Sequence, residues 1–378
     1  MKRAQHFFNE LNSPNHSAVF ESSMTTETIR LTQFSPAAGC GCKLSPEVLR
    51  RILTGVETGS GGDESTNNTA ALLVGNDSRD DSAAVDIGDG RALLSTTDFF
   101  TPIVDDPWDF GQIAATNAIS DIYAMGGRPT VAIAILGWPV DTLAPEVASK
   151  VLAGARATCA EAGIALAGGH SIDVSEPIFG LAVSGLVDID RLRRNDTATA
   201  GDALFLTKPL GVGIISTAGK REKASSRDLV LASQSMRTLN MIGAELSSID
   251  GVTAMTDVTG FGLAGHLTEM MRGSGLDATL DWSAIPTFGD LQLYIDQGCI
   301  PGGTGRNFES VANHMPELSD FQRAILCDPQ TSGGLLVSVR PEACAQVQSV
   351  LQAADLPSTS IGTLSTAASS TPKMILRD

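Results

Sequence analysis

Apolar and polar positions first form regular patterns at about residue 71. Residues 83–100 (AAVDIGDGRALLSTTDFF) contain two short strand-like runs around a Gly-Asp-Gly turn, which predicts a β-hairpin. Residues 107–127 change to helical spacing and end on two glycines, so we expect a helix there. The apolar positions of this helix are Phe110, Ile113, Ala114, Ile119 and Ile122.

The chain continues with three apolar runs and one amphipathic segment. Residues 129–139 (PTVAIAILGWP) predict a buried strand, and residues 144–163 predict an amphipathic helix that stops at Gly163. Two further strands are predicted at residues 164–171 (IALAGGHS) and 178–188 (IFGLAVSGLVD).

A polar stretch at residues 188–202 (DIDRLRRNDTATAGD) separates this region from a second one. The second region opens with the apolar run ALFLTKPLG at 203–211, and helices are expected near 227–248 and 257–273. Strands and helices are mixed on both sides of the polar stretch. We therefore predict an α+β protein with two domains, each mixing helices and strands.

The predicted domain boundaries follow from these patterns. We place an N-terminal domain at residues 71–190 and a C-terminal domain at residues 200–376. Residues 1–28 are polar and are expected to be a disordered extension, most of which a start at Met24 would remove. Residues 29–70 include the run VETGSGGDESTNNTA and are expected to form a mobile loop that acts as a lid.

Composition and charge narrow the class of protein. The chain is 42% hydrophobic and 18% charged, as in soluble globular proteins, and its net charge of -17 argues against a broad nucleic-acid-binding face. No apolar run is long enough to span a bilayer, and residues 1–28 lack the apolar core of a secretory signal. The 6 scattered cysteines do not form a disulfide framework. We expect a cytoplasmic protein with neither nucleic-acid nor membrane partners.

The common nucleotide-binding motifs are absent from the sequence. No segment matches the phosphate-binding loop GxxxxGK[ST], and GVGIIS at 211–216 lacks the third glycine of a dinucleotide fingerprint. If the protein uses ATP, it holds the phosphates in another way.

Five aspartates are candidates for that role. Asp80 and Asp81 precede a predicted strand, Asp98 ends the next strand, and Asp257 follows an apolar strand. Asp121 lies among apolar neighbours on the first predicted helix, where a buried charge costs on the order of several kcal/mol unless it is paired or metal-bound. Each aspartate alone is compatible with a helix cap or a solvated charge. Several of them meeting at one place would suit Mg²⁺.

Four glycine-rich segments lie beside apolar runs. They are 166–171 (LAGGHS), 208–213 (KPLGVG), 301–308 (PGGTGRNF) and 327–336 (CDPQTSGGLL). Glycine-rich turns allow backbone N–H groups to approach phosphate oxygens closely, although an ordinary turn is the better interpretation of each segment alone.

The segment AAGCGCKLS at 37–45 places Cys40 and Cys42 around one glycine, directly before Lys43. The pair is compatible with half of a metal site, with a redox pair, or with a nucleophile for a soft atom. A neighbouring lysine lowers the pKa of a thiol and increases its thiolate fraction. This favours a site that handles sulfur or selenium, but the residues alone leave the three alternatives open.

These residues match a known family. Over almost its whole length after residue 29, the sequence resembles the selenophosphate synthetase (selenide, water dikinase) family, within the wider group of ATP-binding enzymes similar to aminoimidazole-ribotide (AIR) synthetase. The wider group shares the aspartate and glycine motifs but lacks the GCGCK loop. The matching runs include IRLTQFSPAAGCGCKLSP, LLVGNDSRDDSAAV, STTDFFTPIVDDPWDFGQIAATNAISDIYAMGG, GIALAGGHSID, LTKPLGVGI, AMTDVTGFGLAGHL, PGGTGRNF and CDPQTSGGLL.

The resemblance implies a reaction and a fold. ATP, selenide and water would give selenophosphate, AMP and phosphate, with several Mg²⁺ ions and a monovalent cation such as K⁺ as expected cofactors. The N-terminal sheet would pair across a homodimer to form a barrel, beside a C-terminal α/β domain. The resemblance also leaves room for a protein that delivers selenium. The insertion GSGGDESTNN and the N-terminal extension depart from the family pattern.

The resemblance also implies roles for individual residues. Cys40 and Lys43 would be catalytic, whereas Cys42 matches a position that the family does not require. Asp81, Asp121 and Asp257 would hold Mg²⁺. Of the implied ATP contacts, Gly169, His170 and Ser171 would come from the dimer partner. The implied ATP contacts are Lys43, Ser78, Arg79, Asp80, Asp98, Asp121, Gly169, His170 and Ser171.

Two other functions compete with selenophosphate synthesis. Another activity of the wider group, such as a small-molecule phosphotransferase or a cyclo-ligase, would not need the soft nucleophile of GCGCK. A metal-trafficking or redox protein would use the cysteine pair but would leave the aspartate and glycine motifs unexplained.

Overall fold

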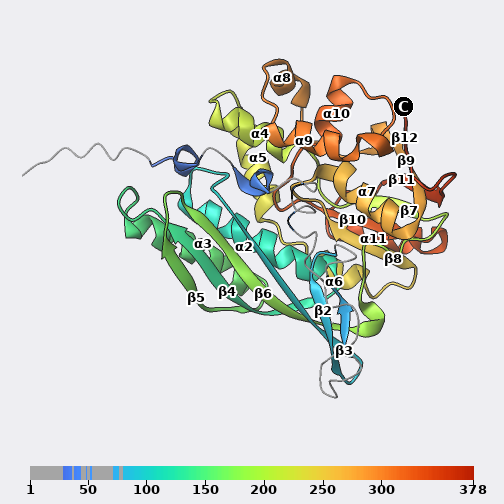
Figure 1. The fold of residues 1–378 in the computed structure, drawn as a ribbon, viewed down its shortest axis with the longest axis horizontal. Helices are drawn as coiled ribbons and strands as arrows, with labels where there is room; N and C mark the ends of the chain where they lie inside the picture. The colour runs from blue at the N-terminus through green and yellow to red at the C-terminus, as the bar shows by residue number, and fades with distance from the viewer. Residues whose placement is uncertain (1–28, 36–37, 44–47, 49–51, 53–70, 76–79) are drawn as a thin grey trace, which may run out of the picture.

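The structure is a computed structural model in which two β-sheets lie side by side, with helices between and around them (Figure 1). The first sheet is built from residues 72–188 and the second from residues 203–377. The α+β prediction is therefore confirmed, but the described residues of this single chain form no closed barrel. The described residues are 29–35, 38–43, 48, 52, 71–75 and 80–378.

The N-terminal sheet has the strand order β1-β2-β3-β6-β4-β5. Strands β4 and β5 pair in parallel, and the other neighbours are antiparallel. The predicted hairpin is confirmed by β2 and β3, which are joined by a turn at Asp89 and Gly90. The strands are β1 (Leu72–Val74), β2 (Ala83–Gly88), β3 (Arg91–Phe100), β4 (Arg128–Trp138), β5 (Ala165–Asp173) and β6 (Ile178–Asp188).

Helices α2 (Pro107–Ala124) and α3 (Pro145–Glu161) confirm the two helices that were predicted for this domain. Helix α2 begins with Pro107 at its first position, and the side chain of Asp106 caps it by accepting a hydrogen bond from Asp109 N. It packs against strands β3 and β6, against α3 and against the second domain. Because it has neighbours on most sides, most of α2 is buried, and its buried polar side chains Thr116, Asn117 and Ser120 require partners.

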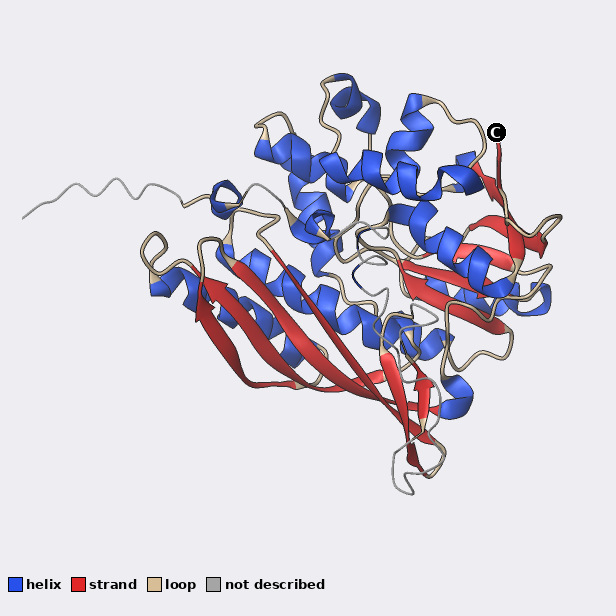
Figure 2. Ribbon diagram, in the orientation of Figure 1, coloured by secondary structure: helices blue, strands red, loops and turns tan. Residues whose placement is uncertain are grey.

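One face of the N-terminal sheet carries no helix among the described residues (Figure 2). Strand β3 alternates, with Leu94 and Phe100 buried toward α2 and Leu93 and Phe99 exposed on the other face. Ile133 on β4 is also exposed. An apolar sheet face without a cover is typical of an interaction surface.

The C-terminal sheet has the order β12-β9-β11-β7-β10-β8, in which β12 and β9 are parallel. Its strands are β7 (Ala203–Leu206), β8 (Val252–Asp257), β9 (Leu276–Asp281), β10 (Leu335–Val339), β11 (Ser360–Thr366) and β12 (Met374–Arg377). The helices of this domain are α4 (Val212–Lys220), α5 (Ser226–Arg237), α6 (Ile242–Leu246), α7 (Gly262–Ser274), α8 (Leu291–Asp296), α9 (Gly302–Val311), α10 (Asp320–Leu326) and α11 (Cys344–Ala353).

Two predicted helices differ from the structure. The single helix expected near 227–248 is wrong, because Thr238 leaves the helical region (ψ 119) and separates α5 from α6. The helix expected at 257–273 begins only at Gly262, because Asp257 is still paired with Leu335 as the last residue of β8.

Two of the glycine-rich segments also differ from the expectation. Residues 166–171 lie inside β5 instead of forming a turn. Residues 302–308 begin α9, with Pro301 as the residue before its first turn. The segments at 208–213 and 327–336 do adjoin strands, β7 and β10. No helix in the part of the chain that the structure describes combines the length and apolarity needed to cross a membrane.

Candidate active site

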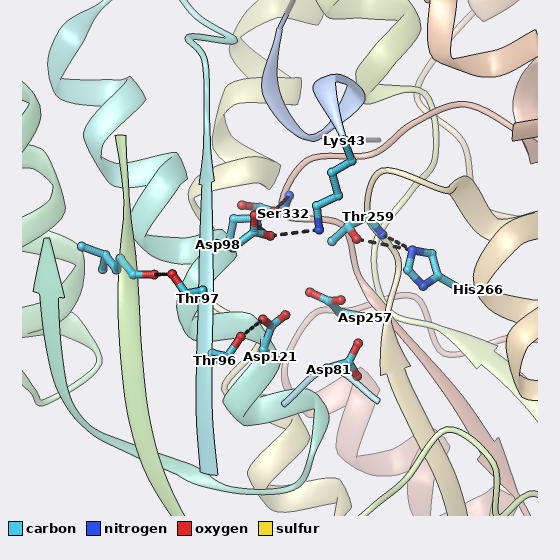
Figure 3. A network of polar contacts seen from close by, with 12 residues as sticks. Lys43, Asp81, Thr96, Thr97, Asp98, Asp121, Asp257, Thr259, His266 and Ser332 are labelled. Carbon is cyan, nitrogen blue, oxygen red and sulfur yellow. Dashed lines mark hydrogen bonds and ion pairs between the residues drawn. The ribbon is translucent and has the colours of Figure 1, made fainter. Parts of the chain in front are cut away.

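Three carboxylates meet where the two sheets approach each other. Asp81 lies just before β2, Asp121 lies on α2, and Asp257 ends β8. A carboxylate oxygen of each lies within 4.8 Å of those of the other two, and the three side chains point toward one another in Figure 3. The structure thus brings together, from the two sheets and from helix α2, the three residues for which the resemblance implied metal binding.

Burial and mutual repulsion raise the pKa values of these carboxyls. Burial is the largest cause for each, and the charge of Asp257 further raises the pKa of both Asp81 and Asp121. The pKa of Asp257 rises to about 6, mainly through burial, against hydrogen bonding from Ser120 and the positive charge of Lys43. Three carboxylates this close are ionised together only where a cation compensates their repulsion.

The cluster of Asp81, Asp121 and Asp257 has the donor set of a divalent-cation site. Asp81 Oδ2 and Asp257 Oδ2 are buried, and neither accepts a hydrogen bond within the described residues. Asp121 Oδ2 accepts a hydrogen bond from Thr96. Carboxylate oxygens are the ligands that Mg²⁺ prefers, and a bound cation would satisfy the two buried oxygens.

Lys43 lies above this cluster and pairs with Asp98 (Figure 3). The distance from Lys43 Nζ to Asp98 Oδ2 is 3.2 Å, and Asn117 Nδ2 donates to the same oxygen at 2.6 Å. The side chain of Lys43 is 37% exposed and that of Asp98 only 10%. The lysine is therefore the partner that can change position, while β3 and α2 hold the carboxylate.

Hydrogen bonds continue from Asn117 into the C-terminal domain. Ser332 N donates to Asn117 Oδ1 at 2.8 Å, and Lys208 Nζ donates to the carbonyls of Ser332 at 2.8 Å and Thr238 at 2.6 Å. Lys208 is buried, and this burial lowers its pKa to about 7. We call the connected residues the seam network: Lys43, Asp98, Asn117, Ser332 and Lys208.

His266 on α7 lies on the far side of Lys43 from Asp98 (Figure 3). Its Nε2 accepts a hydrogen bond from Thr259 N at 3.1 Å. Burial lowers the pKa of His266 to about 3, with a smaller contribution from the charge of Lys43. The imidazole is therefore neutral at ordinary pH and orients the turn between β8 and α7.

Asp80 is engaged with the segment that links the two sheets. Its Oδ1 accepts a hydrogen bond from Asn195 N at 2.7 Å, and its Oδ2 lies 3.6 Å from Arg194 Nε. These contacts hold Asp80 beside the cluster. Ser78 and Arg79, which precede it in the implied ATP-binding run, lie outside the described residues.

Gly169, His170 and Ser171 are not brought to the cluster within one chain. They lie exposed on β5, the edge strand, and β4 and β6 separate them from β3, which carries Asp98. His170 pairs with Ile135 on β4, which in turn pairs with Gly180 on β6. Residues in such a cross-strand row share a face, and Gly180 is paired with Phe99. His170 therefore belongs to the open face of the sheet.

The backbone of the GCGC segment forms a short 3₁₀ turn, η2 (Gly39–Cys42). Gly39 has φ +53, and a Cβ there would lie 2.4 Å from Thr331 Oγ1, so only glycine fits this seat. Gly39 N also donates to Thr101 O at 3.0 Å. The turn thus sits between the end of β3 and the loop before β10. The side chains of Cys40 and Cys42 lie outside the described residues.

Sequence reasoning missed three residues at the site. Asn117 lies four residues before Asp121, one helical turn away on the same face, and this spacing could have identified it. Lys208 lies in KPLGVG, a segment that we considered only for its glycines. His266 gave no local signal, since one histidine after an apolar strand is more often a core residue.

The comparisons with known proteins agree with this architecture. Residues 79–187 match the family described as AIR synthase related protein, N-terminal domain, and residues 199–374 match its C-terminal domain. A thiamine-monophosphate kinase structure from Stenotrophomonas maltophilia has a TM-score of 0.60 and 18% identity, and the match covers 87% of this chain and 95% of that one. At that identity the likeness shows a shared fold.

Curated relatives are far more similar in sequence. A selenide, water dikinase from Photorhabdus laumondii is 55% identical over 90% of this chain and 96% of that protein. A selenide, water dikinase from Aeromonas hydrophila is 58% identical over 89% of this chain and 96% of that protein. This chain belongs to the selenide, water dikinase family, within the AIR synthase related proteins.

Proposed function

We propose that this chain makes selenophosphate from ATP, selenide and water, with release of AMP and phosphate. The observation that carries the proposal is that Asp81, Asp121 and Asp257 meet beneath Lys43. In the GCGCK segment, Lys43 follows Cys40 by three residues. The family supplies the reaction, since its members are named for a kinase activity on selenide and water.

The metal chemistry follows from the cluster. Mg²⁺ held by Asp81, Asp121 and Asp257 would neutralise the triphosphate and the charge that develops during phosphoryl transfer. The buried oxygens of Asp81 and Asp257 that lack a hydrogen-bond partner in the described chain support this assignment. A role for a monovalent cation such as K⁺ stays a prediction.

Lys43 would bind the γ-phosphate of ATP. Its ammonium now rests against Asp98, and its side chain is 37% exposed, so it can extend toward a phosphate oxygen while the buried Asp98 stays in place. Asp98, held by Asn117, would then keep the lysine protonated and oriented. Asp121 would contact the nucleotide only through the metal.

Cys40 would receive or orient the selenide. Its backbone belongs to the turn η2, which is seated by Gly39 next to Lys43. A thiolate close to a lysine is a suitable partner for a soft atom such as selenium. The proposal also keeps the predicted division of the chain. Residues 29–70 would act as a lid, residues 71–190 would form the ATP-binding domain, and residues 200–376 would form a second domain.

A homodimer would complete the site. The open face of the N-terminal sheet is apolar, and it carries His170 on β5 in the same row as Phe99. Pairing of two such sheets would bury this face in a barrel and bring Gly169, His170 and Ser171 to the ATP site of the partner subunit. Ser78, Arg79 and Asp80 would contact ATP from the same subunit as the cluster.

Anaerobic turnover tests the proposal. AMP is measured by chromatography with ATP and Mg²⁺, with and without selenide, for the wild type, Cys40→Ser and Lys43→Met. We expect selenide-dependent AMP formation in the wild type and its loss in both variants. AMP formation that ignores selenide, and that is equal in Cys40→Ser, would show that the cysteine loop serves another acceptor.

A further inference from the structure

A second cavity borders the other side of the GCGC turn. It has a volume of about 560 Å³ and is walled by α4, by the first turns of α9, by Gly41 of the turn η2 and by Pro329 and Thr331 of the loop before β10. None of Asp81, Asp121 and Asp257 is among its walls. It is therefore distinct from the carboxylate cluster, and the cysteine turn lies along one of its walls.

The charge of this cavity is opposite to that of the protein. Lys220 and Arg221 from α4 and Arg306 from α9 line it, and no described residue of its wall is a carboxylate. The chain as a whole carries a net charge of -17. Three cations around one concave space, with the hydroxyls of Ser216 and Thr217, favour binding of an anion.

Helix α9 adds a further attraction for an anion. Gly302 and Gly303 of its first turn line the cavity, no side chain caps this end, and its first turn contains no acidic residue. The N–H groups of such a helix start carry partial positive charge. The start of helix α4, in contrast, already has partners from the protein itself. Asp328 Oδ2 accepts a hydrogen bond from Gly213 N, and Gln330 Oε1 lies 3.3 Å from Gly211 N.

The cationic side chains are held in place at the cavity wall. Arg221 donates to the carbonyl of Gly298 at 2.7 Å, Lys220 donates to that of Ser35 at 2.6 Å, and Arg306 donates to that of Gly41 at 3.3 Å. A guanidinium has five N–H groups, so these contacts orient each arginine and leave further donors for a ligand. Arg306 also connects the cavity directly to the cysteine turn.

We infer that this cavity binds a tetrahedral phosphate-type oxyanion, namely the selenophosphate or orthophosphate that the reaction releases. The identity of the ligand rests on the proposed function. Two arginines and a lysine match the paired oxygen edges of such an ion, whereas a selenide ion offers no edge for a guanidinium fork. ATP is a poorer occupant, because the cavity wall contributes no carboxylate to hold its metal ions.

The test measures binding without turnover. Isothermal titration with orthophosphate and with thiophosphate, a stable stand-in for selenophosphate, is performed on the full chain without ATP or Mg²⁺. The proteins are the wild type, Arg221→Gln, Arg306→Gln and the double variant, with Arg272→Gln on the exposed surface of α7 as the matched control. Thermal unfolding of each variant confirms that it is folded.

We expect both arginine variants to bind the oxyanions at least tenfold more weakly, the double variant to bind weaker still, and Arg272→Gln to match the wild type. Tighter binding of thiophosphate than of phosphate would assign the cavity to the selenium product, and the reverse order to the released phosphate. Equal affinity in the wild type and the folded double variant would overturn the inference. If the variants lose binding but no selenophosphate is made by the wild type, the oxyanion site stands and the proposed function fails.

Discussion

Lys208 donates a hydrogen bond to the carbonyl of Ser332 at 2.8 Å and thereby connects the end of β7 to the loop that faces α2. Ser332 holds φ +48, a left-handed conformation that non-glycine residues rarely adopt. Its N–H is directed at Asn117, which in turn holds Asp98 beside Lys43. A buried lysine in the C-terminal domain thus helps to position a lysine of the N-terminal loop.

Replacing Lys208 with methionine should weaken both the fold and the site. The carbonyls of Thr238 and Ser332 would lose their donor. Ser332 is buried, and an unsatisfied buried group costs about 1–3 kcal/mol. We expect the melting temperature of Lys208→Met to fall by several degrees and kcat to fall at least tenfold. Thermal unfolding and steady-state AMP formation measure the two effects.

Lys150→Met, at an exposed position on α3, is the matched control and should resemble the wild type. A Lys208→Met enzyme with wild-type kcat would show that the seam network does not position Lys43. A lower melting temperature with unchanged kcat would confine the role of Lys208 to folding.

Replacing Asp257 with asparagine should separate metal binding from stability. In metal-free buffer the variant should melt at a higher temperature than the wild type, because one of three repelling carboxylates is removed. Mg²⁺ should raise the melting temperature of the wild type, since ligand at 100 times its dissociation constant stabilises by about 2.7 kcal/mol. In Asp257→Asn this rise should largely disappear, and AMP formation should fall about 100-fold or more.

Differential scanning fluorimetry across a Mg²⁺ titration measures the melting temperature in metal-free buffer and the rise that Mg²⁺ causes. The exposed Asp141→Asn should follow the wild-type curve. An identical Mg²⁺-dependent shift in the wild type and Asp257→Asn would mean that the cation binds elsewhere.

Asp328 should make stability fall as the pH rises toward neutrality. Burial raises the pKa of this carboxyl from 3.8 to about 7, against hydrogen bonds from Gln330 and Gly213. Between about pH 4 and pH 7 the folded protein therefore binds one proton more than the unfolded chain, and its free energy of unfolding decreases with pH. At about 1.4 kcal/mol per pKa unit, the loss reaches at most about 4 kcal/mol.

Asp328→Asn has no titrating proton at this position, so its free energy of unfolding should not show this decrease as the pH rises. Melting temperatures at pH 4, 5.5 and 7 should converge or cross, with the variant gaining on the wild type as pH rises. The cluster carboxyls titrate in both proteins and cancel in the difference. A difference between the two melting temperatures that does not change with pH would refute the titration of Asp328 in this window.

Charge on the open sheet face should prevent dimer formation. Phe99 on this face is 49% exposed, and Ile375 on β12 is also 49% exposed, which makes it a matched control position. We expect the wild type and Ile375→Asp to be dimers by light scattering and Phe99→Asp to be a monomer with little AMP formation. Dimeric Phe99→Asp, or a monomeric wild type with full activity, would exclude this face as the interface.

Local pattern predicted much of the first domain. The hairpin at 83–100 and the helix from Pro107 follow from alternation, a turn with glycines, and a helix start whose proline and aspartate need no distant partner. The sequence itself indicated five candidate aspartates, and the resemblance implied metal binding for three of them. The structure brings the side chains of these three together.

Tertiary contacts explain what the sequence did not reveal. The break between α5 and α6 occurs at Thr238, whose carbonyl accepts from Lys208 in a distant part of the chain. The seam network joins β3 and α2 to residues that follow η2 and β7 and to the loop before β10, so no local spacing identifies it. The cationic cavity likewise exists only where α4 and α9 approach the cysteine turn.

The most direct test of selenophosphate synthesis at the carboxylate cluster is ³¹P NMR of anaerobic turnover, with wild type and Asp257→Asn side by side. The wild type should produce a selenide-dependent phosphorus resonance together with equal amounts of AMP and phosphate, and Asp257→Asn should produce neither. AMP and phosphate accumulating in the wild type without any selenide-dependent resonance would contradict the account, since the site would then hydrolyse ATP without transferring a phosphoryl group to selenium.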